Sequence, residues 1–296
     1  MRAIEYSAPH SVKEAVALLG QEGAAVLAGG TDLLLRLQAG EPGPCRVVDI
    51  KRIPGFAQLR FDPHKGLSIG PAVTLSELER SEVVERHYPA LAQGARVVGS
   101  VQIRNRATLV GNLCNAAPSA DTAPGLLVLG ARLRLVGPDG RRTLALEAFF
   151  QGPGQTALRP GELVVGVQVP TPPPRSGSAY VRHTLRQAMD IAVVGVGVSL
   201  TLAGRRPACA EVAIALGAVA PTPLRARQAE GFLRGEDLTP ERIARAAELA
   251  AAEARPISDV RASAEYRREL VQVLAQRMLQ AALDDARQRS GRRRAA

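Results

Sequence analysis

The first residues that could do chemistry lie at a junction between an apolar run and a helical pattern. The stretch "AVLAGGTDLLLRLQAG", residues 25–40, ends an apolar run on Gly29 and Gly30, continues with Thr31 and Asp32, and then becomes apolar again. Glycines let a phosphate approach the main chain, whose N–H groups can then hold the anion. The same residues also suit a tight strand-to-helix turn that Thr31 or Asp32 caps. This stretch alone leaves both interpretations open.

A second polar segment follows in the middle of the chain. The stretch "QIRNRATLVGNLCNAAPSADTAPGLL", residues 102–127, is rich in glycine, asparagine, serine and aspartate, and it is too long for a plain turn. Long polar loops inside compact α/β units are usually functional. The sequence therefore predicts two polar loops as the candidate binding segments.

Other sources of chemistry are absent from the sequence. The run "GVGVSL" at residues 195–200 resembles a dinucleotide loop but lacks the third glycine and lies in an apolar run, which predicts a core strand. No P-loop, G-x-S-x-G or H-E-x-x-H motif occurs. Cys45, Cys114 and Cys209 form no C-x-x-C pair, so the chain's own cysteines cannot build a zinc site or an iron-sulfur cluster. The four histidines are equally scattered, and we expect no metal site.

The elements that position the two loops are helices and strands that alternate along the N-terminal half of the chain. A capping box at Ser11 and Glu14 begins a helix, and a strand at 25–28, a helix at 33–38 and a strand at 45–50 follow. A second capping box, Thr74 with Glu77, opens helices that run to about residue 98. A hairpin at 138–140 and a strand at 162–170 complete this mixed α/β region.

A proline-rich stretch, "TPPPRSGS" at 171–178, predicts a linker. Beyond it we expect an α+β domain with a three-stranded antiparallel sheet and three helices. The strands are predicted at 179–185, 191–203 and 211–219. Thr239 and Pro240 open the second helix, and the third runs from about Ala262 to Arg287. The predicted units are 1–55, 56–172, 177–288 and a basic disordered tail at 289–296.

The net charge of +10 raises the possibility of nucleic-acid binding. Five arginines fall in the last ten residues, which favours a solvated tail, and aromatic residues for base stacking make up only 3% of the chain. We therefore expect no nucleic-acid partner. The apolar runs are too short and glycine-rich for a transmembrane segment, and the first residues lack a signal-peptide core, so we expect a cytoplasmic protein.

Four stretches in order, "AGGTDLLLRL", "QIRNRATLVGNLCNAAPSADTAPGLLVLGA", "SAYVRHTLRQAMDIAVVGVGV" and "PISDVRASAEYRRELVQVLAQRML", resemble the FAD-binding medium subunit of the molybdenum hydroxylases, the xanthine dehydrogenase and carbon monoxide dehydrogenase family. The resemblance runs nearly end to end. It implies FAD as cofactor and two FAD-binding subdomains of the vanillyl-alcohol oxidase type, with the C-terminal α+β domain covering the flavin.

The resemblance also implies which residues bind FAD. The first loop, Ala28 to Leu33, and the second, Thr108 to Asn112, meet the pyrophosphate, and Asp121 contacts FAD away from the phosphates. Asp32 and Asp121 could equally be helix caps, and Cys114 and Val164 could be packing residues. The full set is Ala28, Gly29, Gly30, Thr31, Asp32, Leu33, Thr108, Gly111, Asn112, Cys114, Asp121, Val164 and Arg182.

Two positions depart from the family's pattern. Arg182 stands where many relatives have a lysine near the flavin ring, with residues 180–191 over the isoalloxazine. Val110 stands where many members have a glycine before Gly111. A β-branched residue resists unusual dihedral angles, which questions the second phosphate contact.

The implied function needs no catalytic residue from this chain. A bound FAD receives electrons from an iron-sulfur cluster and passes them to an external acceptor. The resemblance implies a small subunit with two [2Fe-2S] clusters and a large molybdopterin subunit, in a dimer of heterotrimers. The absence of a cysteine cluster disfavours the 4-hydroxybenzoyl-CoA reductase branch. A free-standing FAD oxidoreductase and an assembly module without FAD remain the alternatives.

Overall fold

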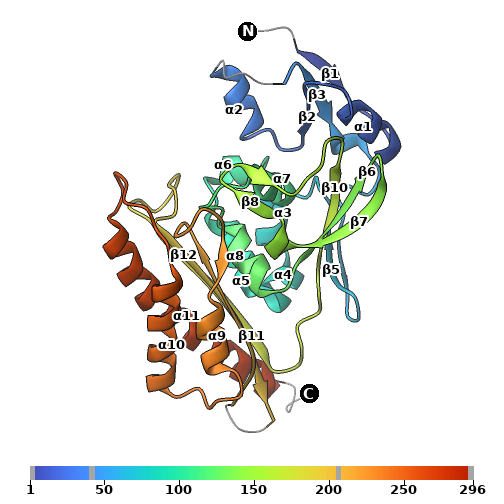
Figure 1. Cartoon of the computed structure of the whole chain (residues 1–296). Helices are drawn as coiled ribbons and strands as arrows, with labels where there is room; N and C mark the ends of the chain where they lie inside the picture. Colours follow the sequence, from blue (N-terminus) through green and yellow to red (C-terminus); the bar gives the residue numbers. More distant parts are fainter. Residues whose placement is uncertain (1–3, 40–43, 205–207, 293–296) are drawn as a thin grey trace.

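Three main sheets organise the chain in a computed structural model that describes residues 4–39, 44–204 and 208–292 (Figure 1). Two of the sheets belong to the N-terminal region and the third to the C-terminal region. The predicted mixture of α and β structure is confirmed. No helix in the described part of the chain is long and apolar enough to cross a membrane.

The first sheet is parallel and three-stranded, in the order β1-β3-β2. Its elements are β1 (Glu5–Ser7), α1 (Val12–Leu19), β2 (Ala24–Leu27), α2 (Leu33–Gln38), β3 (Arg46–Asp49) and the 3-10 turn η1 (Ile50–Arg52). Ser11 caps α1 as predicted, but the Glu14 carboxylate accepts from the N–H of His10 rather than of Ser11. The first predicted capping box is therefore only half formed.

The second sheet is antiparallel and five-stranded, in the order β4-β5-β10-β6-β7. Its strands are β4 (Leu59–Asp62), β5 (Gly66–Ile69), β6 (Arg132–Gly137), β7 (Gly140–Ala145) and β10 (Leu163–Val169). The associated elements are α3 (Leu75–Arg80), α4 (Glu82–His87), α5 (Pro89–Val97), α6 (Val101–Arg104), α7 (Leu109–Asn115), α8 (Thr122–Val128), η2 (Leu146–Ala148), β8 (Phe150–Gly152) and β9 (Gln155–Thr156). The second predicted capping box is complete: Thr74 accepts from the N–H of Glu77, whose carboxylate accepts from the N–H of Thr74.

The third sheet is antiparallel, and it has four strands instead of the predicted three. Its elements are β11 (Ser176–His183), β12 (Val194–Ala203), β13 (Ala208–Gly217), β14 (Leu224–Arg225), α9 (Arg227–Leu233), α10 (Pro240–Glu253) and α11 (Ala264–Arg292). β14 is an edge strand of two residues, too short to produce an alternating pattern. β11 begins inside the predicted linker, at Ser176.

The last helix is longer than predicted. α11 continues past Arg287 to Arg292, so the beginning of the predicted tail is helical. The remainder of that tail, residues 293–296, lies outside the described residues.

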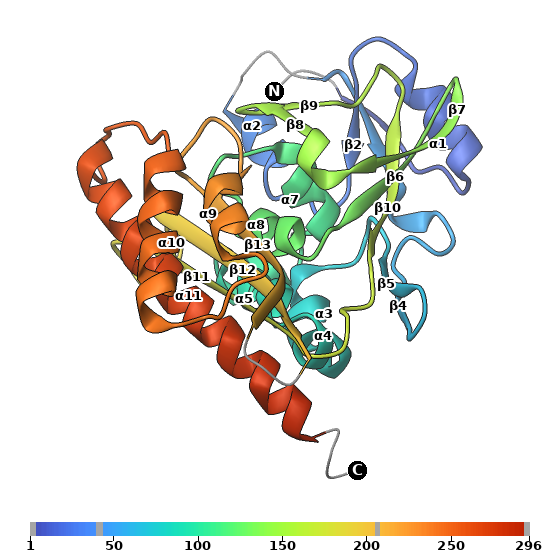
Figure 2. The same ribbon diagram turned by 60° about the horizontal axis from the view of Figure 1, so that its bottom comes forward.

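Helices cover both faces of the third sheet (Figures 1 and 2). α11 packs on β11 and β12, whereas α5 and α8 of the N-terminal region pack on the opposite face. Glycines allow these approaches: a Cβ at Gly197 would lie 3.0 Å from the Pro124 carbonyl of α8, and one at Gly177 would lie 2.1 Å from the Ala282 oxygen of α11. The prediction that "GVGVSL" is a core strand is confirmed, and its glycine at 197 makes room for α8.

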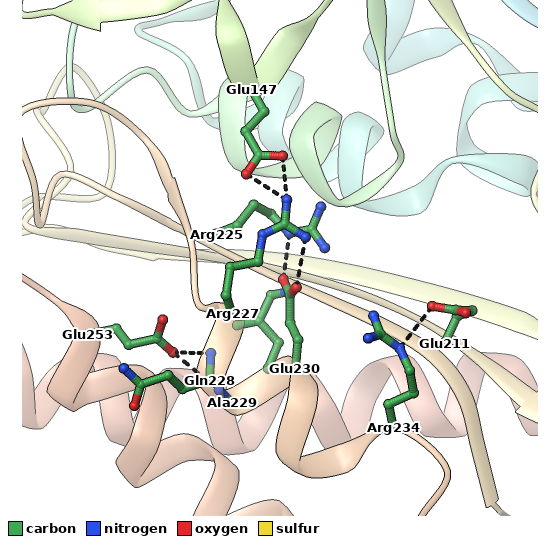
Figure 3. Close-up of polar contacts among 10 residues, drawn as sticks. Glu147, Glu211, Arg225, Arg227, Gln228, Ala229, Glu230, Arg234 and Glu253 are labelled. Atoms are coloured by element: carbon green, nitrogen blue, oxygen red, sulfur yellow. Dashed lines mark hydrogen bonds and ion pairs between the residues drawn. The ribbon is translucent and has the colours of Figure 1, made fainter.

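A group of polar contacts connects the two regions through residues outside the polar loops (Figure 3). We call Glu147, Arg225, Arg227 and Glu230 the outer junction. Arg227 on α9 donates to Glu147 of η2 at 2.6 Å, and this contact crosses between the regions. Both side chains are about half exposed, with 55% and 49% of their surface accessible. The buried Glu230 accepts from Arg225 and from the N–H of Ile214, but these contacts stay within the C-terminal region.

Candidate functional site

A cavity of about 480 Å³ lies between the Gly-Gly turn with α2 on one side and α7 on the other. Its volume is within the range of small-molecule sites. The predicted residues that line it are Ala28, Gly29, Gly30, Thr31, Asp32, Leu33, Thr108, Gly111, Asn112, Cys114 and Val164. Asp121 and Arg182 do not line this cavity. The structure thus brings the two polar loops together, as predicted.

The Gly-Gly turn is fixed at its beginning by a lysine. Lys51 donates from Nζ to the carbonyl of Ala28 at 3.0 Å and pairs with Asp49 at 2.7 Å. The Asp49 carboxylate also accepts from the Tyr6 hydroxyl. Burial alone would raise the pKa of Asp49. The hydrogen bonds from Lys51 and Tyr6 together have the larger effect, so the pKa lies below its ordinary value. The carboxyl ends of the first sheet's strands therefore hold the turn through charged hydrogen bonds.

The two glycines of the turn are required for different reasons. A Cβ at Gly29 would lie 2.1 Å from the carbonyl oxygen of Arg106, because the main chains of the two loops touch at this point. Gly30 has a φ of +81°, a conformation that residues with a side chain rarely adopt. The first glycine thus permits contact between the loops, and the second permits the turn itself.

Several residues that line the cavity have main-chain donors without a partner. Within the described residues, the N–H groups of Gly29, Gly30 and Thr31 make no hydrogen bond, nor does that of Val110 in the second loop. Buried or half-buried N–H groups normally find an acceptor. These groups are therefore available to an anionic ligand.

The second loop adds side-chain donors. Thr108 accepts from the N–H of Gly111 at 3.0 Å, which leaves its own hydroxyl hydrogen free to donate. The Oδ1 atom of Asn112 accepts from the buried Thr122 hydroxyl at 2.7 Å. That contact leaves the amide NH₂ of Asn112 free to donate.

The β-branched Val110 fits the loop without strain. It lies in the first turn of α7 with an ordinary helical conformation, and its side chain is 5% exposed. A position with helical dihedral angles does not require glycine. The dihedral angles at Val110 therefore give no reason to doubt the phosphate contact of the second loop.

Asp32 is not the helix cap that the sequence left as an alternative. It occupies the N-cap position of α2 but makes no capping hydrogen bond. Its carboxylate accepts instead from the Asn115 amide at 3.1 Å, and the Oδ1 atom of Asn115 accepts from Arg36. Burial raises the pKa of Asp32, while Arg36 acts in the opposite direction. This network joins α2 to α7 at the edge of the cavity.

The other carboxylate on the cavity wall also has its own donors. Glu162 forms two hydrogen bonds of 2.7 Å with Arg142 and accepts from the N–H of Arg159 at 2.7 Å. Arg142 lowers the pKa of this carboxyl below its usual range. Its charge is thus compensated before any anion enters the cavity.

The wall offers no activated nucleophile. Burial raises the pKa of the Cys114 thiol to about 12, so this side chain is neutral at physiological pH. In residues 4–39, 44–204 and 208–292, no group of three or more histidines, cysteines or carboxylates could hold a metal ion. The remaining lining is largely apolar, which suits a flat aromatic ligand.

Asp121 and Arg182 bind each other beside the cavity, and with Tyr180 they form what we call the inner junction. Arg182 on β11 donates to Asp121 at 2.6 Å, and the Tyr180 hydroxyl donates to the other carboxylate oxygen at 2.7 Å. The side chains of Arg182 and Asp121 are only 5% and 7% exposed. Burial raises the pKa of both Asp121 and Tyr180. Asp121 occupies the N-cap position of α8 without a capping hydrogen bond, so the capping alternative is wrong here too.

Sequence reasoning missed several residues of the cavity wall. Met189 is not one of these, because it lies in the segment 180–191 expected over the isoalloxazine; its N–H donates to the carbonyl of Gly99, which was missed, at 3.2 Å. Arg36 follows Asp32 by one helical turn, a spacing that could have identified it. The lining residues outside the predicted loops 28–33 and 108–112 and the segment 180–191, and not predicted individually, are Val26, Arg36, Ile50, Val98, Gly99, Ile103, Ala107, Asn115, Leu158, Glu162 and Leu163.

Family models match both regions of the chain. Residues 2–172 match the FAD binding domain in molybdopterin dehydrogenase, and residues 179–282 match the CO dehydrogenase flavoprotein C-terminal domain.

Individual relatives match over nearly the whole length. The chain is 35% identical to the carbon monoxide dehydrogenase medium chain of Hydrogenophaga pseudoflava, over 94% of this chain and 96% of that protein. It is 32% identical to a putative xanthine dehydrogenase FAD-binding subunit of Escherichia coli strain K12, over 94% and 95%. A solved carbon monoxide dehydrogenase from Hydrogenophaga pseudoflava, which lacks the Mo-pyranopterin moiety, superposes with a TM-score of 0.91 at 34% identity and covers 96% of this chain and 98% of that one.

Proposed function

Because the chain belongs to the family of FAD-binding subunits of molybdopterin dehydrogenases, we propose that it is the electron-transfer flavoprotein subunit of such a complex. Bound FAD would supply the redox chemistry, taking electrons from [2Fe-2S] clusters of a partner and passing them to an external acceptor. A small iron-sulfur subunit and a large molybdopterin subunit complete the proposed assembly, a cytoplasmic dimer of heterotrimers.

The observation that carries the proposal is the set of unpartnered donors on the cavity wall. Three consecutive N–H groups, of Gly29, Gly30 and Thr31, have no acceptor within the described chain, and the Asn112 amide is free to donate as well. Hydrogen bonds from main-chain N–H groups suit a diphosphate because they add neither bulk nor a mobile charge. The wall carboxylates already have donors of their own.

This chain's own residues bind and orient the cofactor and hold the two loops together. The Thr108 and Asn112 side chains approach from α7, while the Gly-Gly turn approaches from the end of β2. The apolar wall, with Val164 and Leu163 of β10, excludes water from the rest of the cavity. We infer that Cys114 contributes packing, since its thiol stays protonated.

The visible absorption spectrum of the purified chain with added FAD tests the proposal. We expect oxidised-flavin bands at about one FAD per chain, as a single cavity of this kind requires. A chain that stays colourless even beside its partner subunits would overturn the proposal and leave an assembly module as the better account.

A substitution links the bound flavin to this cavity. Asn112→Asp keeps the acceptor for the Thr122 hydroxyl but puts a carboxylate in place of the free amide. We expect FAD affinity to fall by about tenfold or more, because a charged hydrogen bond is lost and like charges meet. Asn105→Asp, outside the cavity, makes the same charge change and serves as the control.

A further inference from the structure

We propose that Arg36 is the counter-charge for the diphosphate of the bound flavin dinucleotide. The proposal rests on the FAD site proposed above and assigns a ligand to a side chain that the two polar loops do not include. Arg36 lies on the cavity wall, and its guanidinium can form paired hydrogen bonds with phosphate oxygens.

The position of Arg36 on α2 directs it towards the Gly-Gly turn. It follows Asp32 by four residues and Leu33 by three, and all three line the cavity. Side chains on a helix lean towards its N-terminal end. Arg36 therefore shares the cavity with the turn whose N–H groups have no acceptor in the described chain, on the side of α2 that follows this turn.

Arg36 has unused hydrogen-bonding capacity. Of its five N–H donors, one group binds the Oδ1 atom of Asn115. Within the described residues it forms no ion pair at contact distance, although its charge partly offsets the rise that burial causes in the pKa of the nearby Asp32. Asn115 holds the side chain from the opposite wall while leaving its other donors free for a ligand.

The charge balance of the cavity points to the same role. Its charged lining residues are Asp32, Glu162 and Arg36, so Arg36 is the single cation among the described residues of the wall. Glu162 is already neutralised by Arg142, whereas Asp32 accepts from the neutral Asn115 amide, and its pKa, which burial raises, is lowered in part by Arg36. A diphosphate would bring about two further negative charges into this space, and Arg36 offsets part of them.

The affinity of the full-length chain for FAD, measured by flavin fluorescence at several salt concentrations, tests this role. We expect Arg36→Gln to weaken FAD binding by about fivefold to tenfold at low salt. The loss should shrink as salt rises, because the contribution of an exposed charge is screened. Arg245→Gln on α10 makes the same net charge change on an exposed side chain outside the cavity, and its FAD affinity should match that of the unmodified chain.

Two further measurements distinguish charge pairing between Arg36 and the diphosphate from a purely structural role, in which Arg36 only joins α2 to α7. Riboflavin, which has no phosphate, should bind equally to the Arg36→Gln variant and the unmodified chain. Asn115→Ala keeps the arginine and should retain the salt dependence. An equal loss for riboflavin and FAD, or a loss that salt does not change, would overturn the role of Arg36. If the unmodified chain itself fails to bind FAD, the proposed function fails instead.

Discussion

The inner and outer junctions join the same two regions of the molecule in different ways. At the inner junction the pair that crosses between regions, Arg182 with Asp121, is itself buried. At the outer junction the crossing pair, Arg227 with Glu147, is about half exposed, and only the contacts of Glu230 within one region are buried. The buried crossing pair lies next to the cavity wall, because Arg182 also donates to the carbonyl of Asp190, the neighbour of the lining residue Met189.

This difference determines what each junction can contribute. Exposed ion pairs contribute about 0.2–1 kcal/mol, whereas removing one partner of a buried pair leaves a charge without compensation. The inner junction therefore specifies how the C-terminal sheet sits on α8, and the outer junction adds little to that arrangement. Because both side chains are buried, the charges of Asp121 and Arg182 pair with each other.

The largest effect is expected at the inner junction. Arg182→Met leaves the Asp121 carboxylate buried without its cation, and we expect the free energy of unfolding in urea to fall by about 3–5 kcal/mol. Adding Asp121→Asn to this variant should restore much of the loss. A single variant that loses under 1 kcal/mol would show that the two junctions do not differ.

A smaller loss of stability is expected at Glu230, the buried residue of the outer junction. Glu230→Gln removes the charge that binds Arg225 at 2.5 Å but keeps one carbonyl acceptor for the N–H of Ile214. We expect about 2–3 kcal/mol of destabilisation in the same urea experiment, because Arg225, whose side chain is only 13% exposed, loses a charged hydrogen bond, whereas Arg227, at 55%, reaches water. FAD affinity should not change, since these residues lie outside the cavity.

Glu162 with Arg142 gives a pair of intermediate burial, whose side chains are 7% and 28% exposed. Glu162→Gln should cost about 1–2 kcal/mol near neutral pH. Arg142 holds the folded-state pKa of Glu162 below its ordinary value of 4.5, so its contribution is present above that value and lost as the pH falls through the lower folded pKa. Urea unfolding of both proteins from pH 7 to pH 3 should show the difference shrinking; a constant difference would contradict the assigned cause.

The smallest effect belongs to the exposed crossing pair. Glu147→Gln breaks this contact while Arg227 keeps its pairing with Glu230, and we expect a loss of about 0.2–1 kcal/mol that salt reduces further. Thermal unfolding at low and high salt measures it. A loss as large as that of Arg182→Met would remove the distinction between the junctions.

Sequence reasoning succeeded where the determinants are local. α2 has its predicted bounds because the glycines, Thr31 and the apolar spacing lie within a few residues of one another. The capping box at Thr74 is complete for the same reason. β1 and β14 were missed because two or three residues carry no readable pattern.

In the site, too, local features were predicted and features that depend on distant residues were missed. The two loops were identified because each is a continuous segment with its own composition. The Asp121–Arg182 pair joins residues 61 positions apart, and nothing in either segment shows which partner the fold supplies. The steric requirement at Gly29 was equally hidden, because the obstructing atom is the carbonyl of Arg106 on the other loop.

The long final helix sets the order in which the molecule can be completed during synthesis. α11 covers one face of β11 and β12, while α5 and α8, which cover the other face, are made much earlier. Regions generally fold in the order in which the ribosome makes them. The region that forms most of the cavity can therefore assemble on the nascent chain, whereas the third sheet keeps one apolar face open to solvent, and to chaperones, until α11 has been made.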